Sequence, residues 1–162
     1  MLLSVVFVAA VAGPAAKASG AKMCVLTQAD FRAFGTTVDA KPKVNIDQGG
    51  ANVYCVYRGK SGATGGVELD VYYPAGETGS DVEQTFKTVL ASSPGANYQP
   101  EGVPGIDESM YSLTIPQSGY PPFAANAVRR GDLVFAISLP SSPTAKAELL
   151  RLSQLVLARL SR

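Results

Sequence analysis

The fold is decided by residues 51–92, which read ANVYCVYRGKSGATGGVELDVYYPAGETGSDVEQTFKTVLAS. Within this stretch, residues 67–73 alternate between the two faces of an extended chain, which is typical of a half-buried antiparallel strand. The polar face of this strand carries Glu68, Asp70 and Tyr72. Pro74 ends the strand because a proline cannot donate to a sheet ladder. Together with the extended run at residues 52–58, this strand predicts a hairpin.

An amphipathic helix follows the hairpin. Ser80 and Glu83 have the spacing of a capping box, which satisfies free amides at the start of a helix. The apolar stripe of this helix consists of Val82, Phe86, Val89 and Leu90. The same order returns near the end of the chain, where extended runs at 123–130 and 133–139 precede a helix that continues to residue 160. The sequence therefore contains a strand-pair-plus-helix unit twice.

These elements predict the fold class. Hairpins that pair side by side form an antiparallel sheet, and helices with one apolar stripe each cover a face of it. A further helix starts at Thr27, which is followed three residues later by Asp30. We predict an α+β fold: a two-layer sandwich, with an antiparallel sheet, helices on one face and an internal β-β-α pseudo-repeat. The alternative is a mixed sheet with helices on both faces.

The first residues have the pattern of an export signal. Residues 2–13 are an apolar run that is too short to span a bilayer as a helix. Small residues follow, which predicts a signal peptide over residues 1–18 with cleavage after Ala18. No basic residue precedes the apolar run, and the alternative is an apolar helix of the core. We expect an exported protein, periplasmic or secreted, with a single α+β domain over residues 19–162.

Cys24 and Cys55 are the only cysteines of the chain. Two thiols in an oxidising compartment usually pair, so we predict a disulfide that joins the segment before the first helix to the first strand of the hairpin. The alternatives are a metal pair and a redox dithiol. The Cys-x-x-Cys spacing is absent and there is no histidine to complete a zinc site, so we expect neither a metal nor a cofactor.

The charges are balanced, with 14 basic and 13 acidic residues over the whole chain. A nucleic-acid binder carries a basic patch or stripe, and this sequence has no basic run. We therefore expect no nucleic-acid partner. Because the apolar run at residues 2–13 is too short to cross a bilayer, we also expect no stable membrane span.

The sequence contains no histidine, which removes the commonest general base and excludes Ser-His-Asp and Cys-His catalytic groups. Paired carboxylates remain. Asp107 and Glu108 are adjacent, and the alternative is a turn with solvated acids. Glu68 and Asp70 share one strand face, where two like charges can raise a pKa for acid catalysis. Arg58 across the hairpin can instead neutralise them. We assign no catalytic residue.

Tyrosines are the best candidates for a binding surface, because the ring offers apolar area and a polar tip at low entropy cost. Two of them fall on the polar sheet face with Glu68 and Asp70, and others lie in or beside the long loops at residues 93–105 and 116–122. The alternative is that each ring only covers its own strand. The predicted ligand-binding residues are Tyr54, Glu68, Asp70, Tyr72, Tyr98, Tyr111 and Tyr120.

Three short motifs carry a family resemblance. They are Cys24-Val25-Leu26-Thr27-x-x-Asp30, Cys55-x-Tyr57 and Gly105-Ile106-Asp107-Glu108. In these motifs the chain resembles small secreted proteins and lipoproteins of bacteria, many of which, especially in actinobacteria, have no assigned function. Its general plan is also similar to extracellular sensor domains of some bacterial serine/threonine kinases. The resemblance implies an exported, disulfide-bonded α+β domain, and it carries over no catalytic residue.

These observations also predict the class of function. We expect a non-enzymatic binding or sensor-like module for a small molecule, an envelope component or a protein. The first alternative is a small hydrolase that uses paired carboxylates. The second is a structural or inhibitory partner protein of the cell envelope, which would present a flat interface. A cleft between the two long loops and the sheet would favour the binding module.

Overall fold

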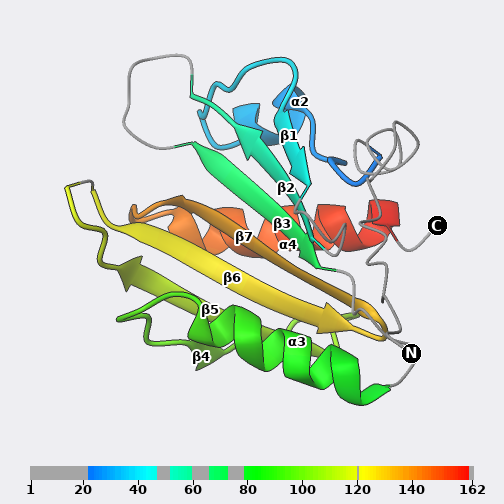
Figure 1. The fold of residues 1–162 in the computed structure, drawn as a ribbon. Coiled ribbons are helices and arrows are strands. Elements are labelled where there is room, and N and C mark those ends of the chain that lie inside the picture. The colour runs from blue at the N-terminus through cyan, green and yellow to red at the C-terminus, as the bar shows by residue number, and fades with distance from the viewer. Residues whose placement is uncertain (1–21, 47–51, 60–65, 73–78, 120, 161–162) are drawn as a thin grey trace, which may run out of the picture.

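The computed structural model describes residues 22–46, 52–59, 66–72, 79–119 and 121–160 (Figure 1). The described helices are α2 (Gln28–Arg32), α3 (Gly79–Ala91) and α4 (Ala145–Leu160). The described strands are β1 (Lys43–Ile46), β2 (Asn52–Tyr57), β3 (Val67–Tyr72), β4 (Gln99–Pro100), β5 (Glu108–Ile115), β6 (Phe123–Arg130) and β7 (Leu133–Pro140). The predicted signal peptide and the predicted cap at Ser80 lie outside the residues whose structure and side chains are described.

The strands form one seven-stranded sheet in the order β1-β2-β3-β7-β6-β5-β4. Every pairing between these strands is antiparallel, and the two halves of the chain meet where β3 pairs with β7. The predicted hairpins are β2–β3 and β6–β7. The prediction of an α+β fold with an antiparallel sheet is therefore confirmed, and the sheet is not mixed.

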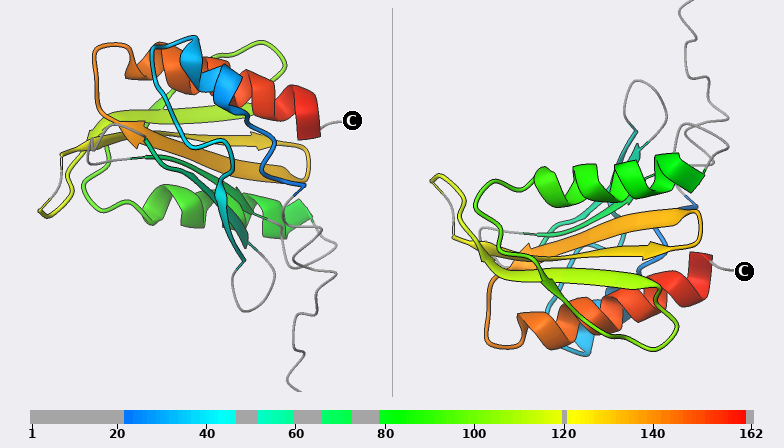
Figure 2. Two further views of the ribbon diagram at one scale, coloured as in Figure 1. Left: turned by 90° about the horizontal axis from the view of Figure 1, so that it is seen from above. Right: turned by 90° about the horizontal axis from the view of Figure 1, so that it is seen from below.

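The helices cover both faces of the sheet, so the prediction of helices on one face is wrong. Figure 2 shows α3 on one side of the sheet and α2 and α4 on the other. The apolar residues of α3 pack with Ala127 and Val134, whereas α4 packs with Val128 and Phe135, the next residues along the same strands. Because β6 and β7 carry apolar side chains on both faces, each face needs a helix to cover it.

The internal pseudo-repeat is not confirmed. Each hairpin is followed by a helix, as predicted, but α3 and α4 lie on opposite faces of the sheet. A two-fold axis that exchanges two neighbouring antiparallel strands is perpendicular to the sheet. The rotation therefore maps each face of the sheet onto itself, and related helices would lie on the same face. The two strand-pair-plus-helix units are therefore not related by such an axis.

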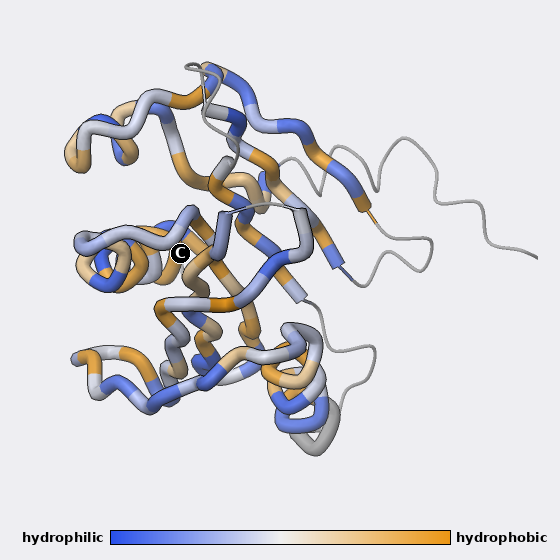
Figure 3. The backbone as a smooth tube through the Cα atoms, turned by 90° about the vertical axis from the view of Figure 1, so that its left-hand side faces the viewer, coloured by the Kyte–Doolittle hydropathy of each residue, from blue (hydrophilic) through white to orange (hydrophobic). Residues whose placement is uncertain are grey.

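The larger core lies between the sheet and the pair α2 and α4. Its largest fully buried side chains include Phe31, Leu69, Phe135, Ile137 and Leu149. Figure 3 shows hydrophobic and hydrophilic residues alternating along the strands, as expected for strands with a buried face. Among the described residues, none of the helices has the length and apolar character that crossing a membrane requires.

The predicted disulfide is present. Cys24 and Cys55 are joined with an S–S distance of 2.07 Å over a sequence separation of 31 residues. The bond ties the segment before α2 to β2, and Cys55 is fully buried in the larger core. A loop of this length stabilises the folded state by about 3–4 kcal/mol in the chain-entropy account.

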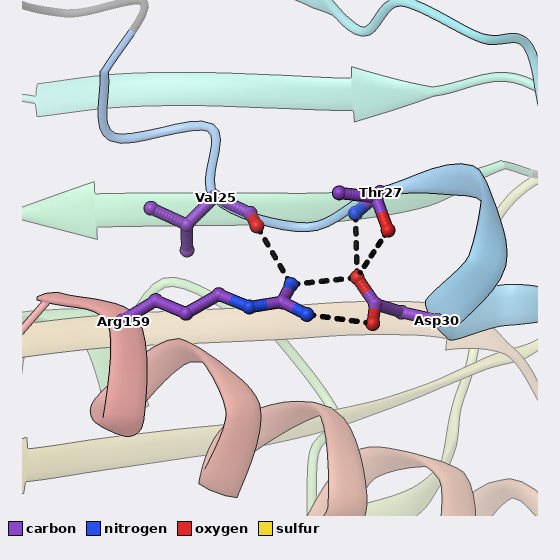
Figure 4. A network of polar contacts seen from close by, with 4 residues as sticks. All are labelled: Val25, Thr27, Asp30 and Arg159. Atoms are coloured by element: carbon purple, nitrogen blue, oxygen red, sulfur yellow. Dashed lines mark hydrogen bonds and ion pairs between the residues drawn. The ribbon is translucent and has the colours of Figure 1, made fainter.

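A network of polar contacts holds α2 to the C-terminal end of α4 (Figure 4). The guanidinium of Arg159 donates to both carboxylate oxygens of Asp30, at 2.6 and 2.8 Å, and to the carbonyl of Val25 at 2.8 Å. The backbone N–H of Thr27 donates to the same carboxylate at 2.6 Å. Hydrogen bonding from Arg159 is the largest cause that lowers the pKa of Asp30 to about 2.

This network predicts an acid-dependent loss of stability. The lowered pKa means that Asp30 stabilises the fold above about pH 4, and this contribution is lost as the pH falls toward 2. With solvent screening allowed for, Asp30→Asn should lower the free energy of unfolding at neutral pH by about 1 kcal/mol, measured by urea denaturation.

The exposed pair of Lys87 and Glu83, at 2.6 Å within α3, supplies the matched control. Glu83→Gln should leave the free energy of unfolding unchanged, because both side chains remain solvated. Equal effects of Asp30→Asn and Glu83→Gln would contradict the role given to the network.

Candidate functional site

A cavity of about 420 Å³ lies between the sheet and the C-terminal end of α3. Its floor includes Glu68, Asp70 and Tyr72 of β3, Ala136 and Ser138 of β7, and Phe123 and Ala125 of β6. Its other walls include Val89 of α3, Ser92 and Ser93 just after that helix, and the loop residues Tyr98, Gln117 and Pro121. The cavity therefore joins the polar face of β3 to both long loops.

Small side chains on the floor leave this space open. In the sheet register Glu68 lies opposite Ser138, and Asp70 lies opposite Ala136. Ala125 lies opposite Ser138 on the far side of β7. The apolar stripe of α3 packs with Ala127 and Val134 on this face, and Ala136 lies against the same cluster. Alternation along β3, β6 and β7 thus places small residues together beneath the end of α3.

Asp70 is the most perturbed acid of the cavity. Burial is the largest cause that raises its pKa to about 7; the nearby Glu68 charge raises it further, and a hydrogen bond with Tyr72 opposes the shift. Oδ1 of Asp70 is buried and has no hydrogen-bond partner among the described residues. Burial also raises the pKa of Glu68. The floor therefore holds two carboxyl groups that bind protons more readily than they do in water.

Tyr72 on the floor and Tyr98 in a wall give the cavity an aromatic lining. Both rings also pack against the smaller apolar cluster under α3, which holds them in place. Burial is the largest cause that raises the pKa of each phenol above its usual value, so both hydroxyls stay protonated at neutral pH. Each tyrosine can present an apolar ring and a neutral hydroxyl to a bound molecule.

The structure thus brings four of the seven predicted ligand-binding residues to one cavity. These four are Glu68, Asp70, Tyr72 and Tyr98. Tyr54 lies opposite Asp70 in the sheet but is not among the lining residues. Tyr111 belongs to the opposite face, where the Lys146 Nζ lies 4.5 Å from its ring centroid. Tyr120 lies outside the described residues.

The second carboxylate pair has a structural role. Glu108 forms an ion pair with Arg129 at 3.0 Å, and Asp107 accepts a hydrogen bond of 2.7 Å from the backbone N–H of Gly131. Neither acid lines the cavity. Arg58 does not neutralise the first pair, because no ion pair between described residues includes Glu68 or Asp70.

Sequence reasoning missed the small floor residues and the wall from α3. Ala125, Ala136 and Ser138 carry no chemistry of their own and matter only because they leave space. Their signal is positional: small residues on neighbouring strands, on the same face as a pair of acids. Within the described part of the chain, no group of three or more Cys, Asp or Glu side chains is placed to hold a metal ion.

The cavity can accept hydrogen bonds, hold a proton near neutral pH and cover an apolar molecule. Its acceptors are the carboxylates of Glu68 and Asp70, and its hydroxyls belong to serines and tyrosines. In the part of the chain that the structure describes, no lysine or arginine lines the cavity. This composition suits a ligand with a hydrogen-bond-donating end and an apolar body.

Burial of Asp70 predicts a stability that falls as the pH rises. Its pKa is about 3.8 when unfolded and about 7 when folded, so the folded state binds the extra proton between these values. Stability should therefore decline from about pH 4 to about pH 7 and stay low above it. Asp70→Asn should remove this decline and raise the free energy of unfolding at about pH 8 by about 1–3 kcal/mol, measured by urea denaturation.

Asp39→Asn, at an exposed position away from the cavity, is the control and should leave the decline in place. A pH dependence that is the same in wild type and Asp70→Asn would show that Asp70 is not buried as described.

Comparisons with known proteins assign no family, because no protein-family model, no curated protein and no solved structure matches the chain. The function is therefore argued from the cavity and the residues that line it.

Proposed function

We propose that the protein is a non-enzymatic binding or sensor-like module whose ligand occupies the cavity between α3 and the sheet. The observation that carries this proposal is the buried, unpartnered Oδ1 of Asp70 at the cavity floor. A buried polar atom without a partner costs free energy, and a ligand that donates to it recovers that cost.

The size and composition of the cavity support a small-molecule ligand. Its volume of about 420 Å³ falls within the range of roughly 300–1,000 Å³ that small-molecule pockets occupy. Apolar side chains such as Val89, Pro121 and Phe123 line the cavity together with polar side chains from β3, β7 and the loops. A structural or inhibitory partner protein would need a flat interface rather than a hollow of this kind.

Export is part of the proposal. The disulfide between Cys24 and Cys55 supports it, because such bonds persist in oxidising compartments. The apolar leader pattern and the resemblance to secreted bacterial proteins favour a periplasmic or secreted location. Mass spectrometry of the protein from its native host should find a chain that begins at Ser19 with both cysteines paired. A cytosolic protein with free thiols would contradict export.

A second candidate function is a small hydrolase that uses Glu68 and Asp70. The observation that favours it is the raised pKa of Asp70, which keeps a proton available near neutral pH for general acid catalysis. The discriminating assay is release of nitrophenol from nitrophenyl glycosides and esters. If the wild type turns over a substrate and Asp70→Asn does not, the hydrolase is favoured. If the wild type shows no turnover, the binding module is favoured.

Binding in the cavity should be visible with simple fragments. A panel of small aromatic amines, alcohols and carboxylates should include compounds that shift the backbone amide NMR signals of the cavity floor. Ala136→Leu should abolish these shifts while the protein stays folded, because the added side chain fills the hollow beside Asp70. If no compound of the panel shifts the NMR signal of any cavity amide, the proposal is contradicted.

Two tyrosines supply a matched control. Tyr98→Ala should weaken fragment binding by about ten-fold, since Tyr98 forms a wall of the cavity. Tyr111→Ala should leave binding unchanged, because Tyr111 lies on the opposite face beside Lys146. Equal losses in both variants would show that binding does not take place in the cavity.

A further inference from the structure

The cavity floor carries negative charge without a fixed positive partner. Glu68 and Asp70 line the cavity, none of the described lysines or arginines lines it, and neither acid takes part in an ion pair with another described residue. Lys43 lies in the same row of the sheet as Glu68 but two strands away, about 10 Å in a sheet of ordinary spacing. Two acids so placed leave a net negative site.

Arg58, which follows β2, forms no ion pair with either acid, and the other nearby base is already engaged. Arg129 lies two strands from Tyr72 in the sheet register. Its guanidinium pairs with Glu108 at 3.0 Å and lies 5.9 Å from the ring centroid of Phe86. These contacts hold the Arg129 charge away from the acids of the floor, so the described part of the chain supplies no countercharge to the cavity.

Asp70 also lacks a donor that an outside molecule could supply. Two buried side-chain atoms have no hydrogen-bond partner among the described residues, the hydroxyl of Tyr57 and Oδ1 of Asp70. Tyr57 packs in the larger core against Phe31, with ring centroids 5.0 Å apart, whereas Asp70 faces the cavity. An ammonium group brings three N–H donors and a positive charge, which is what this floor lacks.

We infer that the ligand of this cavity is a small organic cation, an amine whose ammonium group binds Glu68 and Asp70 while its apolar body lies beneath the end of α3. This inference rests on the proposed binding function and names the chemical class of the ligand. The rings of Tyr72 and Tyr98 also suit a cation, because an aromatic face attracts positive charge.

Affinity for such an amine depends on pH. The titratable groups that face Asp70 are Glu68 and Tyr72 on β3, Tyr54 on β2 and Tyr98 from the loop after α3, while β7 contributes Ala136 and Ser138. Because the pKa of Asp70 is about 7, its charge develops as the pH rises through neutrality. An amine that stays protonated should bind more tightly at about pH 8 than at about pH 6.

The test uses three probes of similar shape: phenethylamine, phenethyl alcohol and phenylacetate. Their dissociation constants are measured on the full chain from shifts of the cavity amide signals at about pH 8, where the amine is protonated. The amine should bind about ten-fold tighter than the alcohol, and the alcohol tighter than the carboxylate. Repeating the titration at about pH 6 should reduce the preference for the amine.

Variants separate charge from shape. The double variant Glu68→Gln, Asp70→Asn should reduce the amine-to-alcohol preference to about two-fold or less, because it removes both charges while both side chains keep their size. Glu83→Gln, on the exposed surface of α3, should leave the preference intact.

The outcomes distinguish the two proposals. If the alcohol binds as well as the amine, the cation inference is overturned and the binding function stands. If the preference survives in the double variant, the charge of Glu68 and Asp70 is not its source, and the inference is again overturned. If no probe shifts the cavity amides, the proposed function falls with it.

Discussion

The structure depends on one constraint: the central strands β6 and β7 are apolar on both faces. Ala124, Ala125, Ala127 and Val128 of β6 are all buried, although neighbours in a strand point to opposite sides. A sheet with such a centre must be covered twice, which places α4 on one side and α3 on the other. The same constraint creates the cavity, because α3 covers only part of its face.

The two faces of the sheet differ in whether their buried polar groups have partners. On the α4 face, buried Asn126 accepts from Ser109 and donates to Ser153, both at 2.9 Å, so these groups satisfy one another. On the α3 face, Glu68 and Asp70 are drawn from water without an ion-pair partner among the described residues. A site that costs stability in the free protein is typical of a position kept for something that binds there.

Much of the fold could be predicted from local sequence patterns. The alternation in β3 and the stripe of α3 predicted both elements and placed Glu68, Asp70 and Tyr72 on one face. The cover on both faces was missed, although β6 indicated it: its residues 123–128 are apolar except for Asn126 and do not alternate, since a strand buried on both sides loses its alternation.

Only part of the site could be predicted. Tyr98 was chosen for its loop, and the structure brings it to the cavity, whereas Tyr111 lies on the wrong face because the sequence does not show which way β5 faces. Ala136 and Ser138 could not be chosen from chemistry, because their contribution is the space they leave. That space depends on how strands distant in sequence pair, and the sequence alone does not establish this pairing.

The most direct test of this account is the titration of individual carboxyl carbons by NMR in the free protein. The account predicts that the Asp70 carboxyl titrates with a midpoint near 7, that of Glu68 above its usual value, and that of Asp30 near 2. Midpoints of about 4 for both Glu68 and Asp70, the values of solvated carboxylates, would contradict it, because the cavity floor would then be open to water.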